Sequence, residues 1–277
     1  MGCGASTPQQ PGGVPVKVSP APVSEANTTL NFAPRASVDD GSVLPSARSM
    51  AGRRSSLEKV MSLTERASPE QVLQNLLEGN QRFLAGESAH PHQDWERVQQ
   101  ISAKQKPLVA ILGCADSRVP AEIVFDQGFG DVFVCRIAGN IATAEEVASL
   151  EYAVLDVGVK VVMVLGHTKC GAVKAALSGN AFPGFIDTLV DHLDVAIARV
   201  DSMNAKQAEA IKAGDPSMMD KVVKENVKYQ VQRCQRSVVI QEALRKRQVL
   251  LVGAMYNLDT GKVQILCTKG GVADDAL

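Results

Sequence analysis

The chain has 277 residues, of which 45% are hydrophobic, 21% charged and 4% aromatic. This balance is typical of a globular protein and excludes a collagen, a mucin and a short disulfide scaffold. Its 29 Lys and Arg residues against 30 Asp and Glu residues give a formal net charge of −1, so we expect no nucleic-acid partner, because the basic field that holds a polyanion is missing.

The first 56 residues differ in composition from the rest of the chain. Ser, Pro and Gly make up 22 of them, and no helical or strand period is present. Such a segment has too little apolar surface to offset the loss of chain entropy on folding. We therefore predict a disordered tail over residues 1–56 and one folded domain over residues 57–277.

The N-terminus carries a lipidation pattern. It reads Met-Gly-Cys-Gly-Ala-Ser, which matches the signal for myristoylation of Gly2, and Cys3 is placed to take a palmitoyl chain. One myristoyl chain binds membranes only marginally, whereas two acyl chains anchor a protein lastingly. We expect membrane attachment on the cytosolic face. Two alternatives stay open, a chance match and a transit peptide for a chloroplast or mitochondrion.

The domain begins with a helix signal and continues with short apolar runs. Ser68-Pro69-Glu70-Gln71 supplies an N-cap, a Pro at the first helical position and the Gln of a capping box. β-branched and apolar runs predict buried parallel strands, and a turn at Asp259-Thr260-Gly261 predicts a hairpin to a last strand. The strand ranges are 108–113, 131–136, 159–166, 248–256 and 263–267.

Helices are predicted between these strands. An amphipathic crossover helix is indicated by apolar residues at helical spacing, namely Val147, Leu150, Val154 and Leu155. A long helical stretch is predicted from Asp215-Pro216 toward Arg247. The alternation of strands and helices predicts an α/β fold with a mostly parallel sheet, four parallel strands plus a C-terminal antiparallel strand, flanked by helices in three layers.

Metal-ligand side chains follow two of the predicted strands. The first strand runs into Cys114, and the third runs into His167-Thr168-Lys169-Cys170. The carboxyl ends of parallel strands form the edge where ligand crevices lie. If these two strands are neighbours, Cys114, His167 and Cys170 converge. Two thiolates and one imidazole suit one tetrahedral Zn²⁺ per chain, and a set of three protein ligands is typical of a catalytic ion.

The charges near this cluster predict an open fourth position. Two thiolates already neutralise the dication, so coordination by Asp116 would make the site negative. Arg118 can engage Asp116 as a bidentate partner and hold it off the metal. Asp116 is then free to orient a metal-bound water. Because thiolates donate more charge than imidazoles, we expect activity to rise toward alkaline pH.

The remaining cysteines and histidines have simpler interpretations. The three cysteines within apolar elements are interpreted as buried structural thiols, and the six cysteines of the chain suit a reducing compartment. The other histidines are interpreted as surface or hydrogen-bonded residues. These cysteines are Cys135, Cys234 and Cys267, and these histidines are His90, His92 and His192.

Four motifs together resemble the β-class carbonic anhydrases, in the order found in that family. They are CADSRVP at 114–120, RIAGN at 136–140, SLEYAV at 149–154 and GHTKCGAV at 166–173. The resemblance extends over approximately residues 68–271. It implies zinc on Cys114, His167 and Cys170, a catalytic dyad of Asp116 and Arg118, and the reversible hydration of CO₂ to bicarbonate and a proton.

The resemblance also implies a substrate pocket and an oligomer. Gln105, Phe133 and Tyr152 match pocket positions of the plant-type branch, and Gly171, next to the zinc ligand Cys170, is expected to bind substrate with them. In the family the Gln and the Tyr reach the pocket across a dimer interface, so a homodimer or a higher homo-oligomer is expected. A solvated Gln and ordinary core aromatics remain the alternative interpretation of these residues.

One position departs from the resemblance, and two other functions remain open. Ile111 stands where bacterial members with a regulatory bicarbonate site carry Trp, so inhibition through that site is not expected. A non-catalytic scaffold of the same fold would bind bicarbonate or a protein partner. Hydrolysis of another cumulated substrate, such as carbon disulfide, would use the same residues. The complete ligand set with Asp116 and Arg118 favours the carbonic anhydrase.

Overall fold

The computed structural model describes residues 67–201 and 216–271. The predicted tail over residues 1–56, with the acylation pattern at Gly2 and Cys3, lies outside these residues. Within the described residues, no helix combines the length and the apolar character needed to cross a bilayer.

A five-stranded sheet with the order β2-β1-β3-β4-β5 forms the centre of the domain. The first four strands are parallel, and β5 pairs with β4 in the antiparallel direction, so the predicted fold class is confirmed. Every residue of β1, β3 and β4 is buried, which explains their near-continuous apolar sequences. The strands are β1 Val109–Gly113, β2 Val132–Arg136, β3 Val161–His167, β4 Leu250–Tyr256 and β5 Val263–Lys269.

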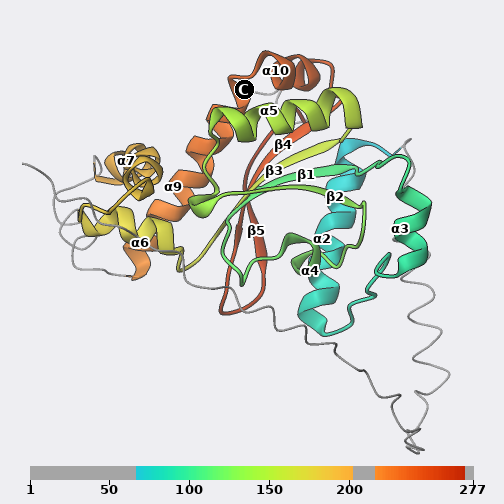
Figure 1. Cartoon of the computed structure of the whole chain (residues 1–277), viewed down its shortest axis with the longest axis horizontal. Helices are drawn as coiled ribbons and strands as arrows, with labels where there is room; N and C mark the ends of the chain where they lie inside the picture. The colour runs from blue at the N-terminus through green and yellow to red at the C-terminus, as the bar shows by residue number, and fades with distance from the viewer. Residues whose placement is uncertain (1–66, 202–215, 272–277) are drawn as a thin grey trace, which may run out of the picture. The chain divides into compact units, whose positions relative to one another are not determined.

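Helices cover both faces of this sheet (Figure 1). One core cluster packs residues of α2 and α4 against the strands, and a second packs residues of α5, α9 and α10 against the opposite face. A third cluster joins α6, α7 and α9 around Cys114 and Cys170. The helices are α2 Pro69–Ala85, α3 Trp95–Ile101, α4 Ala121–Val124, η1 Ala138–Asn140, α5 Ala144–Tyr152, η2 Ala153–Val157, α6 Gly171–Ser178, α7 Ile186–Asp201, α9 Pro216–Gln235 and α10 Val238–Arg245.

Helix α2 begins where its capping box predicts. The side-chain oxygen of Ser68 accepts a hydrogen bond from the backbone N–H of Gln71 at 3.3 Å, and the Gln71 side chain accepts one from the Ser68 N–H at 2.7 Å. Two N–H groups that have no partner inside the helix are thereby satisfied. The capping box therefore fixes the start of α2.

Two helix predictions need correction. The crossover helix α5 ends at Tyr152 and continues as the π-helical turn η2, closed by a bond from the Gly158 N–H to the Ala153 carbonyl. This wider turn changes which side chains face the sheet, so Leu150 is buried while Leu155 is 72% exposed. The long C-terminal stretch is two helices, because Ser237 caps α10 by accepting a bond from the Ile240 N–H at 3.1 Å.

Candidate metal centre

The sheet brings the predicted metal ligands together. β1 and β3 are adjacent and parallel, with Gly113 opposite Leu165, so both strands end at the same edge. Cys114 directly follows β1, His167 is the last residue of β3, and Cys170 is the N-cap of α6. The two sulfur atoms and the ring nitrogen that these side chains offer lie within 4.8 Å of one another, and all three residues are buried. The convergence predicted from the sequence is confirmed.

The orientation of His167 leaves one ring nitrogen ready for a ligand. Its Nδ1 lies 2.9 Å from the carbonyl oxygen of Thr168, to which it donates, because a carbonyl can only accept. The proton on Nδ1 leaves a lone pair on Nε2, which is buried without a hydrogen-bond partner in the structure. A buried polar atom without a partner is costly unless it binds something. A metal-bound imidazole typically donates its other N–H in this way.

A hydrogen bond couples the pKa values of the two cysteines. A hydrogen bond from the Cys170 thiol lowers the pKa of Cys114 to about 4. The same hydrogen bond, together with burial, raises the pKa of Cys170. The backbone N–H of Gly139 also donates to the Cys114 sulfur at 3.3 Å. The pair therefore carries one negative charge at neutral pH, and with the imidazole it forms a soft donor set that fits Zn²⁺ better than Mg²⁺ or Ca²⁺.

Asp116 lies beside the cluster and is held by Arg118. The guanidinium donates from Nε to Oδ1 at 2.9 Å and from Nη2 to Oδ2 at 2.7 Å, and the backbone N–H of Arg118 donates to Oδ1 at 3.0 Å. These hydrogen bonds hold the pKa of Asp116 well below its usual value, so it is ionised. Its Oδ2 is 3.9 Å from Nε2 of His167. The carboxylate is therefore next to the metal-ligand atoms while both of its oxygens are engaged elsewhere.

A second arginine holds the backbone of the same loop. Nε of Arg136 donates to the carbonyl of Cys114 at 2.9 Å, and Nη2 donates to the carbonyl of Asp116 at 2.5 Å. The sequence reasoning missed this role. The sequence did contain an indication of it. Arg136 is the last residue of β2 and pairs with Gly113 of β1, and Gly113 directly precedes Cys114.

The predicted pocket residues fall in two places. Gly171 begins α6, and a Cβ atom built on it would meet no atom within 4 Å, so the space in front of this glycine is open. Phe133 and Tyr152 contact each other, with ring centroids 6.3 Å apart, and Tyr152 is 50% exposed. Gln105 is exposed in the segment before β1. Their part in a substrate pocket stays a prediction.

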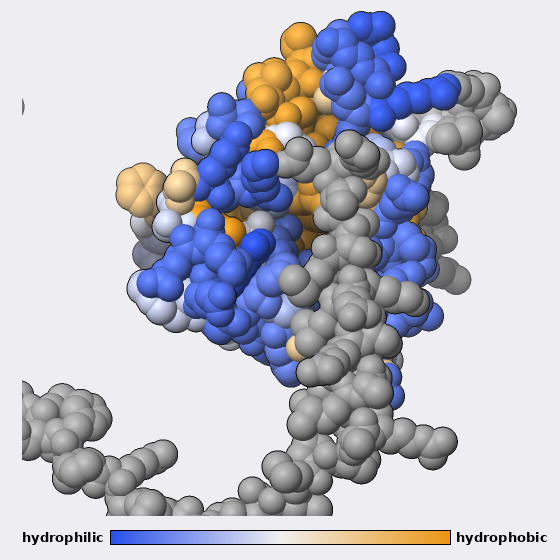
Figure 2. Space-filling model, turned by 90° about the vertical axis from the view of Figure 1, so that its right-hand side faces the viewer, coloured by the Kyte–Doolittle hydropathy of each residue, from blue (hydrophilic) through white to orange (hydrophobic). Residues whose placement is uncertain are grey.

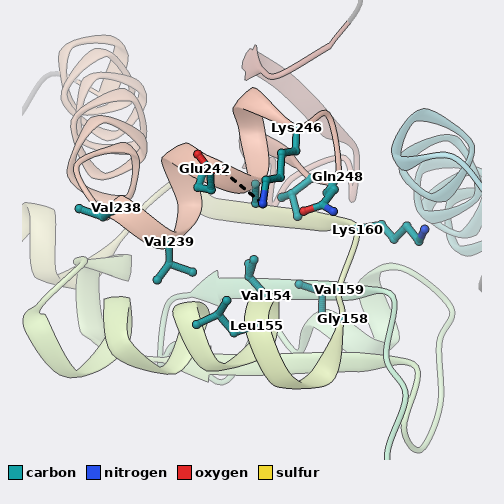
Figure 3. Close-up of a pocket in the computed structure, with 12 residues that line it drawn as sticks. Val154, Leu155, Gly158, Val159, Lys160, Val238, Val239, Glu242, Lys246 and Gln248 are labelled. Atoms are coloured by element: carbon teal, nitrogen blue, oxygen red, sulfur yellow. Dashed lines mark ion pairs between the residues drawn. The ribbon is translucent and has the colours of Figure 1, made fainter.

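A different groove lies far from this chemistry in the fold. It has a volume of about 570 Å³ and lies between η2 and α10, with an apolar floor and charged side chains at its rim (Figure 3). Apolar side chains also gather in the upper part of the surface in Figure 2, at the height of these elements. Lys160 and Val249, which line it, directly precede β3 and β4. The groove thus lies at the amino-terminal ends of the parallel strands, whereas the metal ligands lie at their carboxyl-terminal ends, and none of these ligands lines it.

The other cysteines and histidines mostly follow the sequence interpretation. Cys234 is fully buried, and Cys135 and Cys267 are partly buried in the same core cluster. Burial raises the pKa of all three thiols, so they are poor ligands and nucleophiles. The His92 ring is hydrogen-bonded to the Asp131 carboxylate at 2.7 Å, and His90 is exposed.

Comparisons with known proteins agree with this geometry. A family model described as carbonic anhydrase matches residues 109–263. A carbonic anhydrase of Mycolicibacterium smegmatis is 36% identical over 213 residues, which cover 75% of this chain and 98% of the relative. Carbonic anhydrase 2 of Mycobacterium tuberculosis is 35% identical over 215 residues, with the same shares covered.

Solved structures give the same result. A β-carbonic anhydrase of Sordaria macrospora, described as tetrameric, superimposes with a TM-score of 0.58 and 27% identity, covering 71% of this chain and 98% of that one. A Coccomyxa β-carbonic anhydrase in complex with acetazolamide gives a TM-score of 0.58 and 29% identity, covering 73% and 90%. Sequence and structure comparisons thus point to the same group of proteins.

Proposed function

The chain belongs to the β class of the carbonic anhydrases, the enzymes that interconvert CO₂ and bicarbonate, and we propose how its residues carry out this reaction. The observation that carries the proposal is the convergence of Cys114, His167 and Cys170 at one sheet edge, next to a carboxylate already neutralised by its own arginine. When bound to these three side chains, Zn²⁺ would supply a Lewis acid that makes a hydroxide nucleophile available near neutral pH.

Asp116 orients the nucleophile in this proposal. Because the hydrogen bonds from Arg118 keep it ionised, Asp116 can accept the hydrogen of the nucleophilic oxygen and leave a lone pair directed at CO₂. Arg118 occupies both carboxylate oxygens and so keeps Asp116 from taking the fourth ligand position. Gly171 leaves open space beside Cys170, where a small linear substrate can approach. Bicarbonate then leaves, a water molecule takes its place, and the proton that this water loses as hydroxide is regenerated passes to buffer.

Stopped-flow measurement of CO₂ hydration, combined with zinc analysis of the same samples, tests this proposal. We expect about one zinc per chain and hydration activity in the wild-type protein, and neither in Cys114→Ser. Asp116→Ala should retain zinc and lose most activity. A zinc-loaded Asp116→Ala variant that hydrates CO₂ at the wild-type rate would contradict the role of the dyad. Zinc-loaded wild-type protein without hydration activity would instead support a non-catalytic scaffold or another cumulated substrate.

We also propose that the protein acts as a homo-oligomer whose partner completes the pocket. Tyr152 is half exposed and Gln105 is exposed in the single chain, as expected for side chains that serve a neighbouring protomer. The related Sordaria enzyme is described as tetrameric. Analytical ultracentrifugation should show a dimer or a higher multiple, and Tyr152→Ala should raise KM or lower kcat without loss of zinc. A fully active monomer would exclude this arrangement.

Attachment to the cytosolic face of a membrane through Gly2 and Cys3 is a further proposal. It is supported by the acylation pattern in the sequence. Mass spectrometry of the native N-terminus should find a myristoyl group on Gly2 and a palmitoyl group on Cys3. Gly2→Ala should move the protein from the membrane fraction to the supernatant. An N-terminus shortened by cleavage would support the transit-peptide alternative.

A further inference from the structure

Two buried amide side chains on α9 connect this helix to the segment that supports Cys114. Asn226 donates from Nδ2 to the carbonyl of Gly139 at 2.9 Å, and its Oδ1 accepts from Nε2 of Gln230 at 2.8 Å. Oε1 of Gln230 accepts from the backbone N–H of Ala142 at 2.9 Å. We propose that Asn226 and Gln230 are positioning residues for the zinc ligand Cys114, an inference that rests on the proposed zinc site.

The two backbone groups at the ends of this network determine how both amides are oriented. The Gly139 carbonyl can only accept a hydrogen bond, so it must face the NH₂ group of Asn226. The Ala142 N–H can only donate, so it must face the oxygen of Gln230. The remaining atoms, Oδ1 of Asn226 and Nε2 of Gln230, are then complementary. Only this arrangement satisfies both ends, so the network has a single low-energy state.

Gly139 connects the two amides to Cys114 through its own hydrogen bonds. Its carbonyl is held by Asn226, and its own N–H donates to the Cys114 sulfur at 3.3 Å. Gly139 has a φ of 76°, in the left-handed region, and a Cβ there would lie 3.3 Å from the Cβ of Ala172. A glycine is required in this place, and glycine has the most conformational freedom of any residue. The bond from Asn226 removes part of that freedom and keeps the N–H directed at the sulfur.

The two amides are almost fully buried, and each one bonds a backbone group of the segment over residues 139–142. Asn226 is 0% exposed and Gln230 is 1% exposed. Burying amides costs free energy unless their hydrogen bonds are made, and here each amide bonds a buried backbone group, the carbonyl of Gly139 or the N–H of Ala142. Their hydrogen bonds reach the segment over residues 139–142 and, through Gly139, the sulfur of Cys114. Outer partners of metal ligands fix the ligand's position and charge in this way.

Zinc affinity tests the proposal in the full-length protein. Zinc-free wild type, Asn226→Leu and Val231→Ala are titrated with Zn²⁺ in competition with a chelator. Asn226→Leu keeps the side-chain volume but removes the bond to Gly139, so we expect zinc to bind about 10- to 100-fold more weakly. Val231 is also buried on α9, and it faces Gly253 of β4. Val231→Ala should lower stability and leave the zinc affinity within about twofold.

A spectroscopic measurement separates positioning from stability. With Co²⁺ in place of zinc, the thiolate-to-metal charge-transfer band should shift in Asn226→Leu and stay unchanged in Val231→Ala. Should Asn226→Leu fail to fold, Asn226→Ser, which is shorter and leaves the Gly139 carbonyl unbonded, replaces it. Wild-type zinc affinity and an unshifted band in the folded Asn226 variant would overturn the inference. A wild-type protein that binds no zinc, like Cys114→Ser, would overturn the proposed function itself.

Discussion

Gly166, the residue directly before the ligand His167, has no room for a side chain. A Cβ atom on Gly166 would lie 2.5 Å from Cγ2 of Val227 and 3.4 Å from Cγ1 of Val223, both on α9. Carbon atoms prefer separations of about 3.5–4.0 Å, so Gly166→Ala would push α9 away from β3 by about 1 Å. Overpacking of this kind costs about 1–3 kcal/mol of the free energy of unfolding.

A double-mutant cycle measures the coupling free energy between positions 166 and 227. Val227→Ala alone removes two buried methyl groups and should cost about 2–3 kcal/mol. In the combination with Gly166→Ala, the new methyl group occupies the space that Val227 vacates, so the double variant should be more stable than the sum of the single effects by about 1–2 kcal/mol. Urea unfolding at one protomer concentration and saturating zinc gives the four free energies.

The control for this cycle is Val231, one turn further along α9. It faces Gly253 of β4, where a Cβ atom would lie 3.1 Å from its Cγ2. Gly166→Ala and Val231→Ala should therefore be additive within about 0.5 kcal/mol. Additive effects for Gly166 with Val227 as well, or a neutral Gly166→Ala variant, would show that α9 does not press on β3 at this point.

Three further predictions concern the metal centre. His167→Ala should contain no zinc by elemental analysis and should hydrate no CO₂, because the imidazole is one of the three proposed ligands. Asp116→Asn, which keeps the side-chain size but removes the charge and one of the two oxygens that accept from Arg118, should retain zinc and lower kcat/KM for hydration about 10²- to 10⁴-fold in stopped-flow assays. At pH 7 the metal-free pair holds Cys114 as a thiolate and Cys170 as a thiol, since the pKa of Cys114 is lowered to about 4 and that of Cys170 is raised. Zinc binding should then release about one proton per chain, and affinity should rise with pH, as calorimetry in buffers of different ionisation enthalpy will measure.

The positions of the ligands were predictable from the sequence because strand ends are local features. β-branched runs and the residues that follow them locate Cys114 and His167 at strand termini, and the parallel arrangement brings these termini to one edge. Leu155 was misplaced because a π-helical turn leaves no clear mark in a 3.6-residue period. Asn226 and Gln230 were missed for another reason. Their partners lie 87 and 88 residues away in the chain, and a polar residue on an amphipathic helix is ordinarily assigned to the solvent side.

Arg118 and Arg136 keep the net charge around Cys114, Cys170 and Asp116 close to zero. The negative charges of Cys114 and Asp116 are balanced by Arg118 and Arg136, which hydrogen-bond the same loop. Binding of Zn²⁺ with loss of the Cys170 thiol proton would add one formal positive charge to this group of residues. One hydroxide or one bicarbonate ion would neutralise that charge. Neutral CO₂ would not change this balance of charge. If Asp116 bound the metal instead, Arg118 would lose its partner and the anion its place, so in the proposed mechanism the ion pair at 2.7 Å serves the reaction as well as the fold.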